Sequence, residues 1–258
     1  KVSYICSVLS ENNIEYEKVS WNNEALIIKN ANEIDIKELE IYKNGEIYLQ
    51  SLSSMMPAII LEPKENEDIL DMTAAPGGKT TQIAALTNNK ANITACEMNT
   101  VRADRLKYNV EKQGATSVTV LKEDSRRLND YFSFDKILLD APCSGSGKIL
   151  LINERTYKNF SENLVKKTIK SQKDLLKKAI KILKPGHESV YSTCSILKQE
   201  NENIIKEIIE KGQAEVMPIN EEKLKDIPKL KSNIDGALTV CPNEYYEGFF
   251  VVKLRKKS

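Results

Sequence analysis

Two cysteines follow short apolar runs typical of buried strands, and they are the side chains best suited to covalent chemistry. Cys143 lies in DAPCSGSG, directly after the run KILLD that ends at Asp140. Cys194 lies in YSTCS, 51 residues further along the chain. A single cysteine in such a place is usually a small packed hydrophobe, but two of them beside an acid favour a reactive site. If the two strands are neighbours, both thiols point into one crevice at the carboxyl edge of the sheet.

A glycine-rich turn, DMTAAPGGKT at 71–80, precedes these cysteines. Its small residues, ending in Gly77 and Gly78, let a ligand approach the backbone, and the next helix offers its first N–H groups to an anion. A Walker A loop is the competing interpretation, but it requires a glycine where this chain has Thr73. Glu97 follows the next strand, where an acid typically binds ribose hydroxyls. A packing turn with a surface glutamate remains the alternative to a nucleoside site.

From residue 68 onward, strands and helices alternate along the chain. We expect strands at Asp68–Met72, Asn92–Glu97, Ser117–Leu121, Lys136–Asp140, Ser189–Ser192 and Gly248–Leu254. We expect helices at Gly77–Leu86, Thr100–Gln113, Ser161–Leu183 and Glu200–Lys211, the third closed by the turn KPG at 184–186. This alternation predicts an α/β fold whose mostly parallel sheet is covered on both faces.

The first 62 residues differ in composition from the rest. They carry 5 basic and 10 acidic residues, a net charge of −5, whereas the remainder carries +6. Their pattern predicts a helix near Val2–Asn12, strands near Tyr16–Val19 and Ala25–Ile28, and a turn at Asn44-Gly45. We therefore expect a small N-terminal α/β subdomain over 1–62 and a main domain over 63–258. Because the first residue is Lys, we expect the subdomain to be truncated.

The overall composition excludes several classes of protein. Lys and Arg number 38 and Asp and Glu 37, so the net charge of +1 does not by itself indicate a nucleic-acid partner. The longest uncharged run, 47–61, has 15 residues, fewer than the roughly 18–20 of a membrane-spanning helix. The five cysteines form no CxxC pair, and the single histidine, His187, is poorly placed to anchor a catalytic triad. We expect reduced thiols, no metal, a cytoplasmic location and a monomer.

Four segments together carry a family resemblance: DMTAAPGGKT, DAPCSGSG, YSTCS followed by ENEN, and EGFFVVKLRK. In order and spacing they are similar to the RNA cytosine carbon-5 methyltransferases of the Nop2/Sun family. The resemblance runs from about Tyr48 to Arg255 and includes QSLSSMMPAIIL. It implies a Rossmann-like class I methyltransferase fold with a mostly parallel seven-stranded sheet. It also implies S-adenosylmethionine as cofactor and a cytosine in ribosomal or transfer RNA as substrate.

The resemblance implies a role for each residue that would hold the cofactor. The methionine part would lie against Thr73, Ala74, Ala75, Pro76, Gly77, Gly78 and Lys79. Glu97 would bind the ribose, with Arg102 assisting from the following helix. Asp124 would lie beside the adenine, and Asp140 would lie where the cofactor meets the base. Many relatives have Cys where this chain has Thr73.

The resemblance likewise implies the catalytic groups. Cys194 would be the nucleophile that adds to carbon-6 of cytosine, and Cys143 would release the product. The chemistry of this reaction calls for two further groups. Asp140, in its protonated form, would hydrogen-bond ring nitrogen-3, and Lys79 would either hold or tune Asp140 or be a solvated lysine at the start of the helix. After the Gly-Ser loop many relatives carry an arginine, whereas this chain has Ile149-Leu150-Leu151 there and Arg155 only later.

Three alternatives stay open. The first is a P-loop nucleotide hydrolase, which Thr73 disfavours. The second is an RNA-binding module without catalysis, which the presence of both cysteines disfavours. The third is a DNA enzyme, because such enzymes place their nucleophile in a Pro-Cys dipeptide, as at Cys143, but they lack a partner like Cys194.

Basic residues gather in two places. The expected helix 161–183 and the residue after it carry eight lysines, and Lys166, Lys170, Lys173 and Lys177 fall near one face. A second cluster lies at 253–257. Each is either a solvated face or a surface for RNA phosphates.

Overall fold

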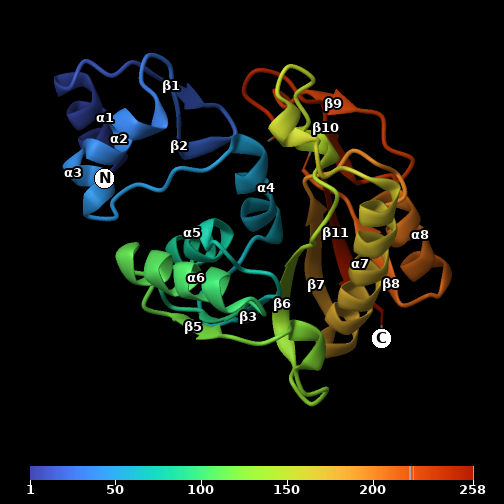
Figure 1. The fold of residues 1–258 in the computed structure, drawn as a ribbon. Helices are drawn as coiled ribbons and strands as arrows, with labels where there is room; N and C mark the ends of the chain where they lie inside the picture. The colour runs from blue at the N-terminus through green and yellow to red at the C-terminus, as the bar shows by residue number, and fades with distance from the viewer. Residues whose placement is uncertain (221, 223, 258) are drawn as a thin grey trace. The chain divides into compact units, whose positions relative to one another are not determined.

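The computed structural model describes residues 1–220, 222 and 224–257. By compactness the chain divides into two units (Figure 1). The first contains Lys1–Leu49 with two short segments, Lys112–Gly114 and Asn220–Ile227, and the rest of the chain forms the second. The first unit thus ends at Leu49, before the boundary expected at residue 62, because the helix that follows packs within the second unit.

The first unit is a small α/β assembly. In chain order it contains α1 (Val2–Glu11), β1 (Tyr16–Val19), β2 (Asn22–Ile28), α2 (Glu33–Glu38) and α3 (Glu40–Lys43). The two strands pair antiparallel, and Leu9, Ile36 and Ile41 form the centre of a local core. The expected helix and strands are confirmed. The short helices α2 and α3 were not predicted, because six and four residues are too few to show a helical period.

The second unit is built around one sheet. Its strands are β3 (Asp68–Asp71), β4 (Asn92–Cys96), β5 (Val118–Leu121), β6 (Phe134–Asp140), β7 (Leu183–Thr193), β8 (Ala214–Met217), β9 (Lys229–Leu230), β10 (Leu238–Val240) and β11 (Phe249–Lys256). The order is β5-β4-β3-β6-β7-β11-β10-β9, and β8 also pairs with β11. Neighbouring strands from β5 through β4, β3 and β6 to β7 pair parallel. Strand β11 pairs antiparallel with β7, β8 and β10, and β10 pairs antiparallel with β9.

The predicted α/β class with a mostly parallel central sheet is confirmed, but the number of strands is not. The described residues form a nine-stranded sheet rather than the expected seven-stranded one. The sequence pattern itself predicted six of the nine strands, and the other three, β8, β9 and β10, have only four, two and three residues. Such short segments do not show a period of two in the sequence.

Helices pack against both faces of the sheet around β6 and β7, the two strands that lead into the cysteine loops. The helices are α4 (Leu52–Leu61), α5 (Gly78–Leu86), α6 (Thr100–Lys112), α7 (Glu162–Ile182) and α8 (Glu202–Glu210), with short 3₁₀ turns η1 (Ser125–Arg127), η2 (Ser146–Lys148) and η3 (Glu154–Thr156). One core joins α7 and α8 to the central strands, with Leu139, Tyr191, Phe250 and Leu176 almost fully buried. Burial on both faces explains why β6 and β11 read as continuous apolar runs.

Two local features differ from the sequence-based prediction. The segment KPG does not close α7 as a turn. Helix α7 ends at Ile182, and β7 begins at Leu183 and runs through Pro185. A register shift accommodates this, because Phe134 pairs with Leu183 but Lys136 pairs with Glu188.

The second feature is α4, which forms from the segment QSLSSMMPAIIL. Ser51 caps it by accepting a hydrogen bond from the Ser54 N–H, and Pro57 lies inside the helix. The helix packs against α5 and against β6, β7 and β11. None of the helices in the described residues is long and apolar enough to cross a membrane.

Candidate active site

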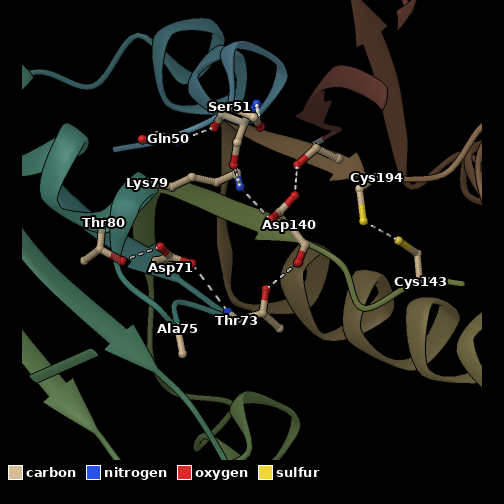
Figure 2. A network of polar contacts seen from close by, with 12 residues as sticks. Gln50, Ser51, Asp71, Thr73, Ala75, Lys79, Thr80, Asp140, Cys143 and Cys194 are labelled. Atoms are coloured by element: carbon tan, nitrogen blue, oxygen red, sulfur yellow. Dashed lines mark hydrogen bonds and ion pairs between the residues drawn. The ribbon is translucent and has the colours of Figure 1, made fainter. Parts of the chain in front are cut away.

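The structure brings the two predicted cysteines together at the carboxyl ends of neighbouring strands. Strands β6 and β7 are parallel, and Asp140 pairs with Ser192 at their ends. The loops that follow place Cys143 Sγ 3.2 Å from Cys194 Sγ (Figure 2). The strand-end rule thus located both thiols correctly, because parallel neighbours end at the same edge of a sheet.

A backbone contact between two glycines holds the Cys143 loop in place. Gly147 N–H donates to Cys194 O at 3.0 Å, and Gly248 N–H donates to Gly147 O at 2.9 Å. A Cβ atom on Gly147 would lie 1.9 Å from Gly248 O. Gly147 is therefore required by close approach of backbones rather than by a special dihedral angle. Ser146 Oγ and Ser195 Oγ add a hydrogen bond of 2.8 Å between the same two loops.

The two thiols differ in their electrostatics. The hydrogen bond with Cys143 lowers the pKa of Cys194, and the charge of Lys148 lowers it further, against the effect of burial. The same hydrogen bond raises the pKa of Cys143, and burial raises it too. Cys194 is therefore the thiol that ionises first, and only a thiolate is an effective nucleophile.

Asp140 is held by a lysine and a serine. Lys79 Nζ lies 2.7 Å from Asp140 Oδ2, and Ser192 Oγ donates to Asp140 Oδ1 at 2.7 Å (Figure 2). Lys79 also donates to Ser54 Oγ at 2.6 Å, which ties α4 to the site. An adjacent ammonium and a hydroxyl donor both stabilise a charged carboxylate. The expected contact of Lys79 with Asp140 is therefore present, and the protonated form of Asp140 stays a prediction.

The glycine-rich loop connects β3 to α5 and is anchored by a buried acid. Asp71 is 1% exposed and accepts a hydrogen bond from Thr80 Oγ1 at 2.7 Å. Burial raises the pKa of Asp71 to about 6. Thr73 Oγ1 donates to Asp140 O at 2.8 Å, so the loop is fastened to the end of β6. Sequence reasoning gave Asp71 no role, although an acid at the end of an apolar strand was a signal for one.

The amino end of α5 offers free backbone donors. Gly77 precedes the helix with a φ of +114°, a region that favours glycine. No side chain caps this end. The first N–H groups of the helix are thus available to an anionic group of a ligand.

Glu97 and Arg102 lie together beside this loop. Glu97 is 5% exposed, and one of its oxygens lies 3.4 Å from Arg102 NH2. Arg102 also donates to Ala75 O at 2.9 Å, which joins the acid to the loop. Asp124 instead binds Arg126, with 2.6 Å between Oδ2 and NH2. The Arg126 guanidinium keeps the pKa of Asp124 below its usual range.

Lys148 and Glu247 are neighbours of the thiols that sequence reasoning missed. Lys148 Nζ lies 3.5 Å from Glu247 Oε2, and Ser51 Oγ donates to the same oxygen at 3.2 Å. Glu247 comes from the segment before β11, about 100 residues after Lys148 in the chain. No local spacing could have indicated this pair.

The expected basic face of α7 is only partly free. Lys178 is buried and pairs with Asp130, and Lys173 Nζ lies 2.6 Å from Glu207. Lys170 and Lys177 are exposed and have no acidic partner among the described residues. No group of three or more His, Cys, Asp or Glu in the described part of the chain is arranged to hold a metal ion. The expected absence of a metal stays a prediction.

Residues 58–255 match the family model described as 16S rRNA methyltransferase RsmB/F. The chain belongs to this family. Among curated relatives, ribosomal RNA small subunit methyltransferase F of Shewanella piezotolerans is 36% identical over 94% of this chain and 52% of its own length. The tRNA (cytosine(72)-C(5))-methyltransferase of Pyrococcus horikoshii is 38% identical over 86% of this chain and 55% of its own. The RsmB/F chain described here thus spans about half the length of these relatives.

Solved structures agree with this assignment. The crystal structure of PH0851 aligns with a TM-score of 0.89 and 31% identity over 99% of this chain and 57% of that one. The structure of NSun6 from Pyrococcus horikoshii with SFG aligns with a TM-score of 0.77 and 35% identity over 86% of this chain and 56% of that one. The resemblance to the Nop2/Sun family is confirmed, and with it the Rossmann-like class I methyltransferase fold.

Proposed function

We propose that this chain transfers a methyl group from S-adenosylmethionine to carbon-5 of a cytosine in RNA through a covalent adduct on Cys194. The observation that carries the proposal is the pair of thiols 3.2 Å apart, beside an acid that is joined to a glycine-rich loop. Relatives named as rRNA and tRNA (cytosine-C5) methyltransferases support it. NSun6 was solved with SFG, an analogue of S-adenosylmethionine.

The residues present fit this cofactor. The uncapped N–H groups of α5 suit its carboxylate, and the buried Glu97, held by Arg102, suits the ribose hydroxyls. The loop 73–79 leads into the amino end of α5, and its Ala75 O accepts from Arg102, which holds Glu97. When bound, the cofactor supplies an electrophilic methyl group to the crevice beside Asp140.

Carbon-5 of cytosine is too weak a nucleophile to react unaided, and Cys194 solves this problem. Its thiolate forms a bond to carbon-6, and the ring electrons move through carbon-5 and carbon-4 to nitrogen-3, which takes a proton. The Lys79–Asp140 pair would supply that proton and take it back when the ring is restored. Carbon-5 then takes the methyl group. A base then takes the carbon-5 proton, and the electrons of that C–H bond re-form the carbon-5–carbon-6 double bond and expel the Cys194 thiolate. Cys143 would either take the carbon-5 proton or protonate the departing sulfur. The target base must leave its stack to enter the crevice.

Ribosomal and transfer RNA are both proposed substrates, because the relatives include enzymes named for each. The cytoplasmic location and the monomeric state stay predictions.

The two thiols are distinguished by a denaturing gel with labelled RNA and S-adenosylmethionine. Cys194→Ala removes the attack, so we expect no covalent species. Cys143→Ala leaves the attack and the methyl transfer but slows release, so we expect an adduct to accumulate. An adduct with Cys194→Ala and none with Cys143→Ala would reverse the roles. Full activity in both variants would remove thiol catalysis from the proposal.

A further inference from the structure

We propose that Glu200 is a positioning residue that holds Cys143 against Cys194, and that its carboxylate serves the release of methylated RNA rather than the attack. This inference rests on the proposed function. Glu200 precedes α8 and touches neither sulfur through its carboxylate, so it acts through the loop that carries Cys143.

The Glu200 side chain is an acceptor for four hydrogen bonds. Glu200 is 0% exposed, and its Oε1 accepts from Ser144 N at 2.8 Å and from Thr168 Oγ1 at 2.6 Å. The same oxygen accepts from Gln172 Nε2 at 3.3 Å, and Oε2 accepts from Ser144 Oγ at 2.6 Å. Thr168 and Gln172 lie on the buried face of α7. The carboxylate therefore fastens the residue after Cys143 to a long, well-packed helix.

The residue before Cys143 is held from the same side. Gln172 Nε2, besides contacting Glu200, donates to Pro142 O at 2.9 Å. Both chain neighbours of Cys143 are thus fixed by a network that converges on one buried acid.

The next residue, Asn201, holds the chain neighbours of the other thiol, Cys194, by hydrogen bonds. Thr193 Oγ1 donates to Asn201 Oδ1 at 2.6 Å, and Asn201 Nδ2 donates to Ser195 O at 2.8 Å. These are the chain neighbours of Cys194. Tyr191 Oη also donates to the backbone oxygen of Glu200 at 2.6 Å. The pair Glu200–Asn201 therefore sets the separation of the two sulfurs, with the Glu200 side chain on the Cys143 side and Asn201 on the Cys194 side.

The two acceptor oxygens of the Glu200 side chain point to a role beyond packing. No Lys or Arg pairs with it among the described residues, and burying a carboxylate without a cation is costly. A neutral side chain would serve a merely structural anchor. A carboxylate, however, accepts from both the N–H and the O–H of Ser144 at once, because both of its oxygens are acceptors. This geometry fixes one particular loop conformation, which is what a thiol that must reach a covalent adduct requires.

The test follows the covalent adduct in the whole chain described here, with labelled in-vitro transcripts of 16S rRNA and tRNA as probes. We expect Glu200→Ala to accumulate the adduct, as Cys143→Ala does, and to lower steady-state turnover about tenfold or more. Single-turnover methylation should change by less than about threefold, because the attack by Cys194 is intact. Glu200→Gln keeps one oxygen as an acceptor, so its adduct accumulation should lie between those of the wild type and Glu200→Ala. The matched control is Glu202→Gln, two residues further on, also buried but bonded to Ser232, and it should accumulate no adduct.

A second set of variants keeps the inference testable if Glu200→Ala does not fold. Thr168→Val and Ser144→Ala each remove one hydroxyl donor to the carboxylate and should reproduce part of the adduct accumulation. In a Cys143→Ala background, Glu200→Gln should slow release no further, because both changes act on one step. Additive slowing would overturn the inference.

The outcomes separate this inference from the proposed function. An adduct with Cys143→Ala but none with Glu200→Ala would overturn the inference and leave the proposed function standing. No adduct and no methylation in any variant, wild type included, would overturn the proposed function itself. Equal losses of attack and release in Glu200→Ala would reduce Glu200 to a structural residue.

Discussion

At the scale of single residues, two identical side chains acquire different chemistry from their partners. Cys194 and Cys143 donate to or accept from each other, yet the pKa of Cys194 is lowered and that of Cys143 is raised. Lys148 contributes to the difference because its positive charge lowers the pKa of Cys194. The surroundings of the two thiols thus favour Cys194 as the proposed nucleophile, in agreement with the family resemblance.

Glu97 gives a direct test of the cofactor site. Glu97→Ala should weaken binding of S-adenosylmethionine by about 1–3 kcal/mol, the usual cost of losing a hydrogen bond to a charged group. Isothermal titration calorimetry measures this loss. The exposed neighbour Glu123→Ala is the control and should bind as the wild type does. Tight binding of ATP instead of this cofactor would contradict the site assignment.

Asp71 predicts an unusual dependence of stability on pH. Its pKa is about 6 in the folded chain and 3.8 in the unfolded chain, so between these values the folded state holds more protons. Its contribution to the free energy of unfolding therefore falls as pH rises from about 4 to 6, by about 3 kcal/mol.

The comparison of wild type with Asp71→Asn isolates this contribution. The variant keeps an acceptor for Thr80 but cannot ionise, so its stability should lose less than that of wild type over the same rise in pH. Denaturant unfolding at several pH values measures the difference. The exposed Asp174→Asn is the control. Parallel pH profiles for wild type and Asp71→Asn would contradict the shifted pKa.

At the scale of elements, the sequence predicts what has a strong local signal. Helix α7 was predicted to within one residue at each end, because Ser161 caps it and its apolar face repeats over 21 residues. Strands β3, β4 and β6 were found because they are apolar runs between turns. Helix α4 was noticed as a motif but not as a helix, since its serines and Pro57 obscure the period.

The residues of the candidate site also fall into those that the sequence predicted and those that it did not. The thiols, Asp140 and the glycine loop were predictable because each directly follows a strand. The Lys79–Asp140 pairing was expected from the chemistry of the reaction that the resemblance implies. The links from Glu200 to Ser144 and Thr168 were not, because they join segments 56 and 32 residues apart that only the folded sheet brings together.

The η2 turn yields a prediction about backbone packing. Gly147→Ala would place a Cβ 1.9 Å from Gly248 O, so the loop must shift away from Gly248, which disturbs the hydrogen bond from Gly147 N–H to Cys194 O. We expect methylation to fall about tenfold or more, while the melting temperature changes by only a few degrees, because the clash is confined to one three-residue turn. Gly212→Asn is the control, since the space around Gly212 is open and Asn tolerates its positive φ. Unchanged activity in Gly147→Ala would show that the loop adapts.

At the scale of the whole molecule, a net charge of +1 conceals an uneven surface. On α7, acidic partners from other elements neutralise some lysines and leave Lys170 and Lys177 exposed. Their spacing of seven residues places them on one face of the helix. This reduces the predicted RNA-binding face to fewer side chains than the sequence suggested.

Charge reversal tests that face. Lys170→Glu with Lys177→Glu should weaken RNA binding and lower the slope of log affinity against log salt by about 2, while cofactor affinity stays unchanged. Filter binding over a series of salt concentrations measures both. The control is Lys107→Glu with Lys122→Glu, which changes the charge equally but removes lysines that already lie near Glu111 and Asp104. Equal slopes for the two double variants would assign α7 to an ordinary solvated surface.

The 3.2 Å between the two sulfurs has a consequence outside methyl transfer. A peroxide can oxidise the Cys194 thiolate to a sulfenic acid, which Cys143 then displaces, so that two thiols and one peroxide give a disulfide and two waters. Methylation by the wild type should then be lost on treatment with hydrogen peroxide and restored by dithiothreitol. Cys143→Ala has no second thiol to trap the sulfenic acid, so further oxidation should make its loss of adduct formation irreversible. The arrangement that suits the enzyme to release its product would thus also make its activity follow the redox state of its surroundings.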